Sequence, residues 1–330
     1  MKLSILDQSP VYTGMSAEEA LQASLNLAQL GEKYGYTRFW LTEHHDIDGL
    51  ASTAPEVLLA FIGAQTSRIR LGSGAVLLPH YKPYKVAEVF HTLATLFPGR
   101  IDLGIGRAPG GSAEVTMALN DNFMQKVYEM PDRLEEVLHL IHNDFPEEHP
   151  YSKINALPLP NIPPEPWLLG TSKKSARLAA RNGMAYAFGQ FMSDEDGDNI
   201  LQTYLNEFLP KGNMEKPMAL ITVNVVCSES AEEAKDIVLR QGLWQILRTY
   251  RSKPSFPTHN EYTNYRFNEK ERSIVDSILN KTIYGTPEEV INVLTKLANQ
   301  TSVSEVMIST YASSLEERIK SYQLIGQALK

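Results

Sequence analysis

The chain has 330 residues, of which 43% are hydrophobic and 21% are charged, and its formal net charge is −8. This composition is ordinary for a soluble globular enzyme, and the negative charge argues against a nucleic-acid or anionic-membrane partner. The single cysteine, Cys227, excludes an intrachain disulfide and a cysteine-based metal cluster, so a cytoplasmic location is expected. The first residues form too short an apolar run for a signal peptide, and no run approaches the roughly 20 apolar residues of a membrane span.

Short apolar runs alternate with amphipathic segments along the whole chain. The segments with helical spacing begin at capping-box sequences such as Ser16–Glu19, or at a proline in the first helical position, as at Pro55. The apolar runs predict eight strands, over residues 3–6, 38–41, 70–78, 101–107, 167–170, 185–188, 218–226 and 305–310.

Eight strand–helix alternations over this length predict an α/β fold, specifically a (β/α)8 TIM barrel, rather than an open doubly wound sheet. No linker or charge run divides the chain, so residues 1–330 are expected to form one barrel domain with loop insertions. Three excursions interrupt the alternation, at about 108–130, 146–166 and 251–272. The second holds seven prolines, and the third is interpreted as a mobile excursion on the functional rim.

Glu43, His44 and His45 follow directly after the predicted strand 38–41. In a parallel barrel, groups at the carboxyl ends of strands meet on the rim that carries catalysis. Successive residues at a strand end point to opposite sides, so one imidazole faces the barrel mouth, and the alternation does not say which. The structural alternative is a hydrogen-bonded pair that ties down a loop.

A zinc site is less favoured, because the chain has no HExxH sequence. His139 and His142 lie three residues apart on a predicted helix. They are interpreted as part of a solvated face with Glu135 and Glu136.

Two glycine-rich stretches follow strands of the same sheet. The run 71–79, Leu-Gly-Ser-Gly-Ala-Val-Leu-Leu-Pro, offers the small residues that a flat aromatic ligand stacked on backbone would need; a glycine-kinked strand is the alternative. The run 104–111 resembles a dinucleotide fingerprint, but Pro109 and two glycines open a loop instead of a helix, so that reading is rejected. Arg107 is better interpreted as a fixed cation for a phosphate or an anionic ring.

Gly170, Thr171 and Ser172, followed by Ser175, mark the end of a strand and the start of a helix. Backbone N–H groups and the helix dipole favour an anion there, although N-capping by Ser172 alone would explain the serine. With Arg107 on the same rim, phosphate binding is the favoured interpretation.

Four motifs together resemble the bacterial luciferase-like flavin monooxygenases. They are residues 7–10, Asp-Gln-Ser-Pro; 40–45, Trp-Leu-Thr-Glu-His-His; the 72–79 stretch; and 98–107, Pro-Gly-Arg-Ile-Asp-Leu-Gly-Ile-Gly-Arg. The resemblance covers essentially the whole chain and is strongest before Gly111. It implies a (β/α)8 barrel that binds reduced FMN, or the deazaflavin F420, at the C-terminal rim.

The resemblance also implies residue roles. His44 matches the histidine in acid–base chemistry, Glu43 the carboxylate beside the cofactor, and Gly74-Ala75 the pair that backs the isoalloxazine ring, often through a cis peptide. The remaining cofactor-binding matches are Gly106, Arg107, Gly170, Thr171, Ser172 and Ser175, of which Arg107 and the hydroxyl residues match a phosphate cradle. Gly106 stands where the luciferase α-chain has a reactive cysteine, and Thr171 where it has an acidic residue, so luminescence does not follow.

The implied activity is that of a two-component monooxygenase. Reduced FMN would arrive from a separate flavin reductase, and dioxygen would be spent on a small organic substrate, with aldehydes among the candidates. F420-dependent oxidoreduction is an alternative, for which Lys173 and Lys174 are candidate contacts to the polyglutamyl tail. A non-catalytic flavin-binding partner subunit is a third, although such chains often lose the histidine. The resemblance further implies a homodimer.

Overall fold

The computed structural model describes residues 1–212, 214–250 and 256–329. Within these ranges, eight parallel strand positions close into a barrel in the order β10-β1-β2-β3-β5-β6-β7-β8, and β10 pairs with β8 to complete the ring. This confirms the predicted (β/α)8 barrel. The strands are β1 Lys2–Asp7, β2 Arg38–Leu41, β3 Arg70–Ser73, β4 Val76–Leu77, β5 Ile101–Gly106, β6 Glu165–Gly170, β7 Ala185–Gly189, β8 Ala219–Cys227, β9 Thr282–Gly285 and β10 Glu305–Ser309.

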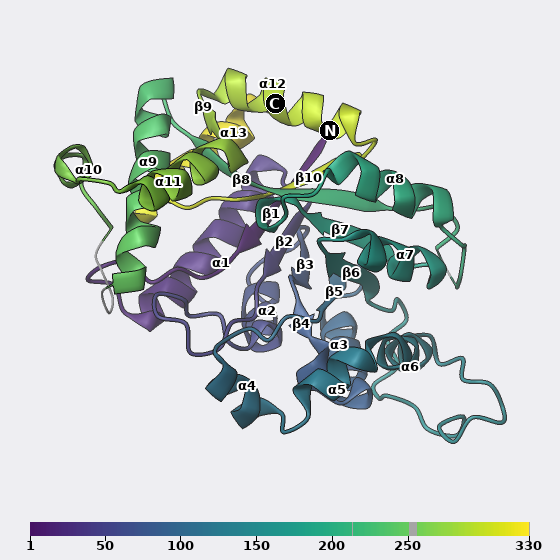
Figure 1. The fold of residues 1–330 in the computed structure, drawn as a ribbon. Helices are drawn as coiled ribbons and strands as arrows, with labels where there is room; N and C mark the ends of the chain where they lie inside the picture. Colours follow the sequence, from purple (N-terminus) through teal and green to yellow (C-terminus); the bar gives the residue numbers. More distant parts are fainter. Residues whose placement is uncertain (213, 251–255, 330) are drawn as a thin grey trace.

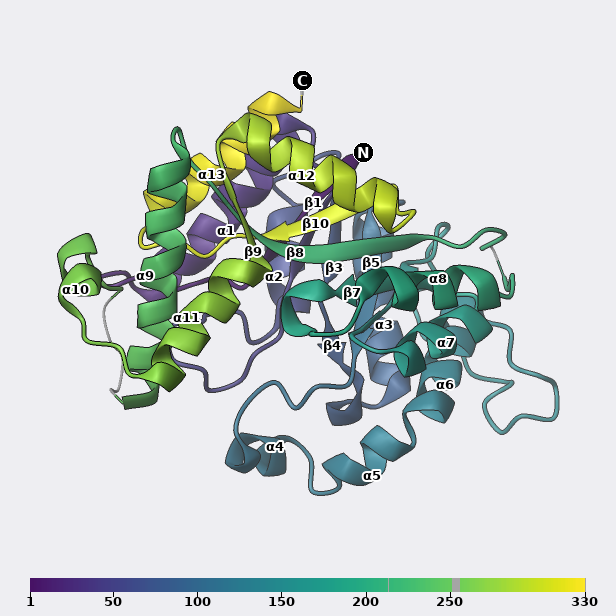
Figure 2. The ribbon, with the colours of Figure 1, turned by 45° about the horizontal axis from the view of Figure 1, so that its top comes forward.

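Helices surround the barrel on all sides, and both termini lie near each other at its upper edge (Figures 1 and 2). None of the helices in the described ranges is both long and apolar enough to cross a membrane. Their bounds are α1 Ala17–Tyr34, α2 Pro55–Gly63, α3 Pro83–Leu96, α4 Ala113–Leu119, α5 Phe123–Tyr128, α6 Met130–His142, α7 Lys173–Arg181, α8 Gly197–Glu207, α9 Ala231–Tyr250, α10 His259–Asn264, α11 Glu269–Lys281, α12 Pro287–Gln300 and α13 Leu315–Ala328.

Alternate residues of each strand serve two different cores. In β2, Phe39 and Leu41 pack outward in the layer between barrel and helices, whereas Trp40 packs inside the barrel against Trp167 of β6. The two indole rings meet edge to face with centroids 5.2 Å apart. The period of two in strand side chains therefore fills the barrel interior and the outer layer from the same four residues.

A layer of buried charges closes the amino-terminal end of the barrel. Arg38, the first residue of β2, forms ion pairs with Asp102 of β5 (3.0 Å), Glu165 of β6 (2.9 Å) and Glu305 of β10 (2.9 Å). Arg70 also pairs with Asp102. Burial lowers the pKa of Arg38, but the three carboxylates raise it above its ordinary value, so this charge is fixed. The layer holds five strands together at the end opposite the predicted site.

Three predicted segments differ from the structure. The strand expected over 70–78 is split into β3 and β4, with residues Gly74 and Ala75 between them. The excursion expected over 108–130 contains the short helices α4 and α5, while residues 146–164 have no helix or strand, as expected. In the part of the excursion 251–272 that the structure describes, helix α10 and the start of helix α11 are present. Residues 251–255 lie outside the described ranges.

Strand β9 was not predicted. It pairs with the outer half of β8, from Asn224 to Cys227, whereas β10 pairs with β8 only up to Asn224. A four-residue run such as Thr282–Gly285 gives too weak a periodic signal to be recognised without its partner strand.

Candidate functional site

The carboxyl ends of β2, β3/β4, β5 and β6 are neighbours in the barrel, and they carry the predicted site residues. Glu43 and His44 follow β2, Gly74 and Ala75 follow β3, Gly106 ends β5, and Gly170 ends β6. The fold thus brings these predicted site residues to one continuous sector of the rim, because the strands are parallel and adjacent.

Glu43 is buried and fully engaged. One carboxylate oxygen accepts hydrogen bonds from the Tyr81 hydroxyl (2.6 Å) and from Nε2 of His45 (2.8 Å), and the other accepts from the Leu77 amide (3.0 Å). Burial, and then the Glu43 carboxylate, raise the pKa of Tyr81, so its hydroxyl stays a donor. His45 is further fixed through its backbone N–H, which donates to the Gly110 carbonyl (2.8 Å). The loop-tying interpretation therefore holds for Glu43 and His45.

His44 has a different environment from His45. Its Nδ1 lies 3.0 Å from Oγ1 of Thr42, and its backbone N–H donates to the Ser52 carbonyl. Among the described residues, none forms a hydrogen bond with its Nε2. Burial, and then the neighbouring His45, lower the pKa of His44, so the imidazole is neutral near pH 7. A half-buried, neutral imidazole with one uncommitted nitrogen is suited to accept a proton.

The Gly74–Ala75 peptide bond is cis, as the resemblance implied. Ala75 faces Gly106 of the neighbouring strand, where an added Cβ would lie 3.1 Å from the Ala75 Cβ. Gly104 lies two residues before Gly106 on the same strand. A Cβ at Gly104 would overlap the Ser73 carbonyl oxygen, so the position has no room for a side chain. This part of the rim is consequently built from backbone and small residues.

Arg107 and the start of α7 follow the carboxyl ends of the adjacent strands β5 and β6. The last paired residues of β5 and β6 are Ile105 and Leu168, so Arg107 and Gly170 are each two residues beyond that pair. Arg107 is exposed, and it forms no ion pair with any residue that the structure describes.

The start of α7 is capped by its own serines. Ser172 is the N-cap and accepts from the Ser175 N–H, while the Ser175 hydroxyl donates to the Ser172 carbonyl (2.7 Å) and lies 3.0 Å from the Tyr186 hydroxyl. A Cβ at Gly170 would overlap Ser175 Oγ. Capping, the alternative weighed from the sequence, is therefore present, and the first two N–H groups of α7 remain outside it.

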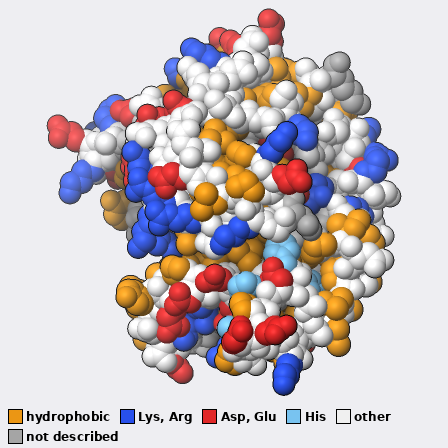
Figure 3. Space-filling model, turned by 90° about the vertical axis from the view of Figure 1, so that its right-hand side faces the viewer, with side chains coloured by type: hydrophobic (Ala, Val, Ile, Leu, Met, Phe, Trp, Pro, Cys, Tyr) orange, Lys and Arg blue, Asp and Glu red, His pale blue; other side chains and the backbone are white. Residues whose placement is uncertain are grey.

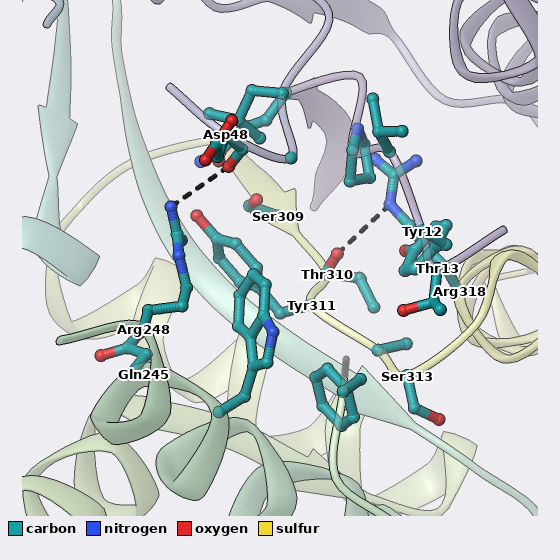
Figure 4. A pocket seen from close by; sticks show the side chains of 18 of the residues that line it. Tyr12, Thr13, Asp48, Gln245, Arg248, Ser309, Thr310, Tyr311, Ser313 and Arg318 are labelled. Atoms are coloured by element: carbon teal, nitrogen blue, oxygen red, sulfur yellow. Dashed lines mark hydrogen bonds between the residues drawn. The ribbon is translucent and has the colours of Figure 1, made fainter. Parts of the chain in front are cut away.

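A cavity of about 460 Å³ lies in the next sector of the rim, where β10, β1 and β2 end and α9 covers them (Figure 4). None of its lining residues belongs to the predicted set. They come from four separate stretches and two single positions: Gln8, Pro10, Val11, Tyr12, Thr13, Asp48, Gly49, Leu50, Trp244, Gln245, Arg248, Thr249, Phe256, Ser309, Thr310, Tyr311, Ala312, Ser313 and Arg318. The available sequence signal was that residues 8–13 and 309–313 both follow strands that a closed barrel makes neighbours.

The far wall of this cavity contains a buried ion pair. Arg318 of α13 donates from Nη2 to Asp7 (2.7 Å) and from Nε to the Thr310 carbonyl (3.2 Å). The charge of Arg318 is thereby compensated within the protein, and the pair joins the last helix to the end of the first strand.

The histidines of α6 do not form a metal site. His139 pairs with Asp144 (2.7 Å), and no group of three or more His, Cys, Asp or Glu side chains in the described ranges is arranged to hold a metal ion. Histidine side chains on this side of the molecule lie at the surface among acidic and apolar side chains (Figure 3). His139 and His142 are both half-buried, so they are less solvated than the expected face with Glu135 and Glu136.

The architecture is that of a TIM-barrel enzyme with its candidate site at the C-terminal rim. The sequence profile described as luciferase-like monooxygenase matches residues 1–304, and the chain belongs to this family. The N-acetyl-S-alkylcysteine monooxygenase of Bacillus subtilis is 39% identical over 334 residues, covering 100% of this chain and 98% of that protein.

Two solved structures are similar to this chain along its whole length. The crystal structure of apo-MsnO8 is similar with a TM-score of 0.82 and 33% identity, covering 99% of this chain and 98% of that one. The oxygenating constituent of 3,6-diketocamphane monooxygenase from Pseudomonas putida, solved in complex with FMN, has a TM-score of 0.71, 18% identity, and coverage of 99% and 97%. At that identity, the second similarity concerns the fold alone.

Proposed function

We propose that the protein is a two-component flavin-dependent monooxygenase, which uses reduced FMN and dioxygen to oxygenate a small organic substrate. The observation that carries the proposal is the convergence of His44, the cis Gly74–Ala75 peptide, Arg107 and the start of α7 on adjacent strand ends. A bound reduced flavin would supply the two electrons needed to place one oxygen atom on the substrate and to release the other as water.

The donor set at β5 and β6 fits the phosphate of FMN. Arg107 is exposed and forms no ion pair within the described ranges. The capping box of the nine-residue helix α7 does not use the first N–H groups of that helix. Thr171 and Ser172 add hydroxyl groups beside these N–H groups. A dianionic phosphate is favoured by the helix dipole and by the planar guanidinium together.

The surface between β3 and β5 fits the edge of a flat ring. A side chain at Gly106 would approach Ala75 to 3.1 Å, so the glycine keeps the backbone open on that side. Gly74 donates its N–H to the Leu41 carbonyl (2.7 Å), which anchors the pair to β2. Glu43, already saturated by three donors, would hold the shape of this surface and not act on a ring directly.

His44 would move the proton that oxygen transfer requires. Its neutral imidazole would take a proton at Nε2 while Thr42 holds Nδ1. The name of the Bacillus subtilis relative suggests N-acylated thioether amino acids as substrates to assay, alongside the aldehydes that the family resemblance implies.

The proposal is tested with His44→Ala and Arg107→Gln. The first should leave the affinity for reduced FMN unchanged and abolish product formation coupled to oxygen uptake. The second should weaken FMN binding about tenfold, the effect of losing one or two charge-assisted hydrogen bonds. His259→Ala and Arg177→Gln are the matched controls, because these exposed side chains pair with Asp236 and Glu207 and are not among the proposed site residues. Unchanged coupled product yield in His44→Ala would reject the assignment.

F420 is the second candidate cofactor, and Lys173 and Lys174 at the start of α7 are the observation that favours it. Their ammonium groups would meet the carboxylates of a polyglutamyl tail, which FMN lacks. Anaerobic titration with reduced FMN and reduced F420 separates the two, because only F420 affinity should fall in a Lys173→Gln, Lys174→Gln double variant. If neither cofactor supports oxygen uptake with any substrate, a non-catalytic partner subunit is the better description.

Two partners follow from the proposal. A flavin reductase would supply reduced FMN, because the chain carries no nicotinamide-binding fingerprint. A second copy would cover α2, which has apolar residues on its outward side as well as its inward side: Val57 is 67% exposed and Phe61 42%, and Leu96 of the adjacent α3 is 59% exposed. A helix that is apolar all round is normally buried, so we propose a homodimer through α2 and α3.

A further inference from the structure

The cavity between the ends of β10, β1 and β2 and helix α9 is not accounted for by the flavin site. It borders that site, because the loop after β2 serves both. His44 donates its backbone N–H to Ser52 at one end of this loop, while Gly49 accepts from the Val11 N–H (2.8 Å) in the cavity wall. A molecule in the cavity would therefore lie one loop away from the imidazole that is proposed to move a proton.

We infer that this cavity is the substrate pocket, and that its substrate is a small organic carboxylate with an apolar arm, whose carboxylate binds Arg248. This inference rests on the proposed function for the reaction, but the pocket and its ligand class are argued from the cavity alone. A volume of about 460 Å³ falls within the range of small-molecule sites.

Arg248 is positioned to bind an anion. Its guanidinium lies over the Trp244 ring, 4.8 Å from the centroid, and Nη2 donates to the Asp48 carbonyl (3.3 Å). Figure 4 shows the side chain reaching from α9 towards Asp48, beside Tyr311. Stacking and one hydrogen bond fix the plane of the group. Among the described residues, that bond engages one of its five N–H donors, and a carboxylate can meet the others in a bidentate way.

The other guanidinium in the wall is already committed. Arg318 is 2% exposed, and it is compensated by Asp7 and by the Thr310 carbonyl. A ligand anion would thus gain little there. Asp48, the acidic residue of the lining, has an interaction of its own and offers Arg248 its backbone carbonyl. The anion subsite is therefore assigned to Arg248.

The remaining wall is suited to an apolar arm. Trp244 and Phe256 lie with ring centroids 5.7 Å apart, and Val11 and Leu50 line the opposite loops. An alkyl or thioether arm buried among these side chains would remove their apolar surface from water, which favours binding. A substrate with a carboxylate at one end and an uncharged, oxidisable arm at the other would match Arg248 on one side of the cavity and the apolar side chains on the other.

The test measures binding without any cofactor. Trp40 and Trp167 are fully buried, so quenching of tryptophan fluorescence by a ligand in the cavity reports mainly on Trp244. The probes are N-acetyl-S-methylcysteine and its uncharged primary amide. The wild-type chain should bind the acid about tenfold more tightly than the amide, as expected for charge-assisted hydrogen bonds. Arg248→Gln should bind both alike, and Arg177→Gln should retain the preference.

Three results would overturn the inference: equal binding of acid and amide by the wild type, a preference that survives in Arg248→Gln, or displacement of the acid by FMN in direct competition. The proposed function fails separately. If reduced FMN neither binds nor supports oxygen uptake while the acid preference persists, the pocket stands and the monooxygenase reaction does not. If Arg248→Gln retains full affinity for reduced FMN, as expected, the two sites are distinct.

Discussion

Replacing Asp102 by asparagine tests whether the charged layer at the amino-terminal end of the barrel stabilises the fold. The carboxylate is 0% exposed, and it accepts hydrogen bonds from Arg38 (3.0 Å), from Arg70 and from Trp40 Nε1 (2.9 Å). The asparagine keeps the volume but removes the charge, and its amide N–H₂ group would face the two guanidinium groups.

The expected loss of stability can be estimated from these contacts. Removing one partner of a buried ion pair costs about 3–5 kcal/mol, because the remaining charge is left uncompensated. Arg38 keeps Glu165 and Glu305, each at 2.9 Å, so the lower end of that range, about 3 kcal/mol, is expected. With an unfolding entropy of about 2.1 cal/mol/K per residue over 330 residues, this corresponds to a decrease in Tm of roughly 4 °C.

The assay is thermal and urea unfolding followed by circular dichroism. Glu88→Gln is the matched control, since it makes a similar change in the exposed pair with Lys85 and should change stability by less than about 0.5 kcal/mol. If Asp102→Asn and Glu88→Gln unfold at the same temperature and urea concentration, the buried charges contribute no net stability and the reasoning is wrong.

Three further predictions follow from the same structure. Gly104→Ala should fold poorly or melt well below the wild type, because its Cβ overlaps the Ser73 carbonyl inside the barrel; soluble yield and Tm report this, and a wild-type Tm contradicts it. The pH profile of coupled kcat/KM should have its acidic limb below pH 6.5, because burial and then His45 lower the pKa of His44. Protonation therefore removes the base only at lower pH. An acidic limb above pH 6.5, or one that persists in His44→Gln, contradicts this role of His44. Phe61→Lys should convert the proposed dimer to monomer in light scattering with size exclusion, whereas a monomeric wild type would remove the dimer from the proposal.

The succession of strands and helices that forms the barrel could largely be predicted from the sequence. Strand Arg38–Leu41 and the capping box at Ser16 are where local pattern placed them, because strand periodicity and N-terminal capping depend on neighbouring residues. The resemblance also anticipated the cis bond at Gly74–Ala75. These features are local, or belong to motifs that survive as short runs of sequence.

The tertiary structure alone decided the distribution of roles around the rim. Which imidazole is tied to Glu43 depends on Tyr81 and Leu77, whose positions relative to residue 43 no local pattern gives. The cavity is further removed from local pattern, because its lining comes from residues 8–13, 48–50, 244–249 and 309–313, together with Phe256 and Arg318. Closure of the barrel makes the ends of the first and last strands neighbours, and only then do a loop, a long helix and Arg248 enclose one space.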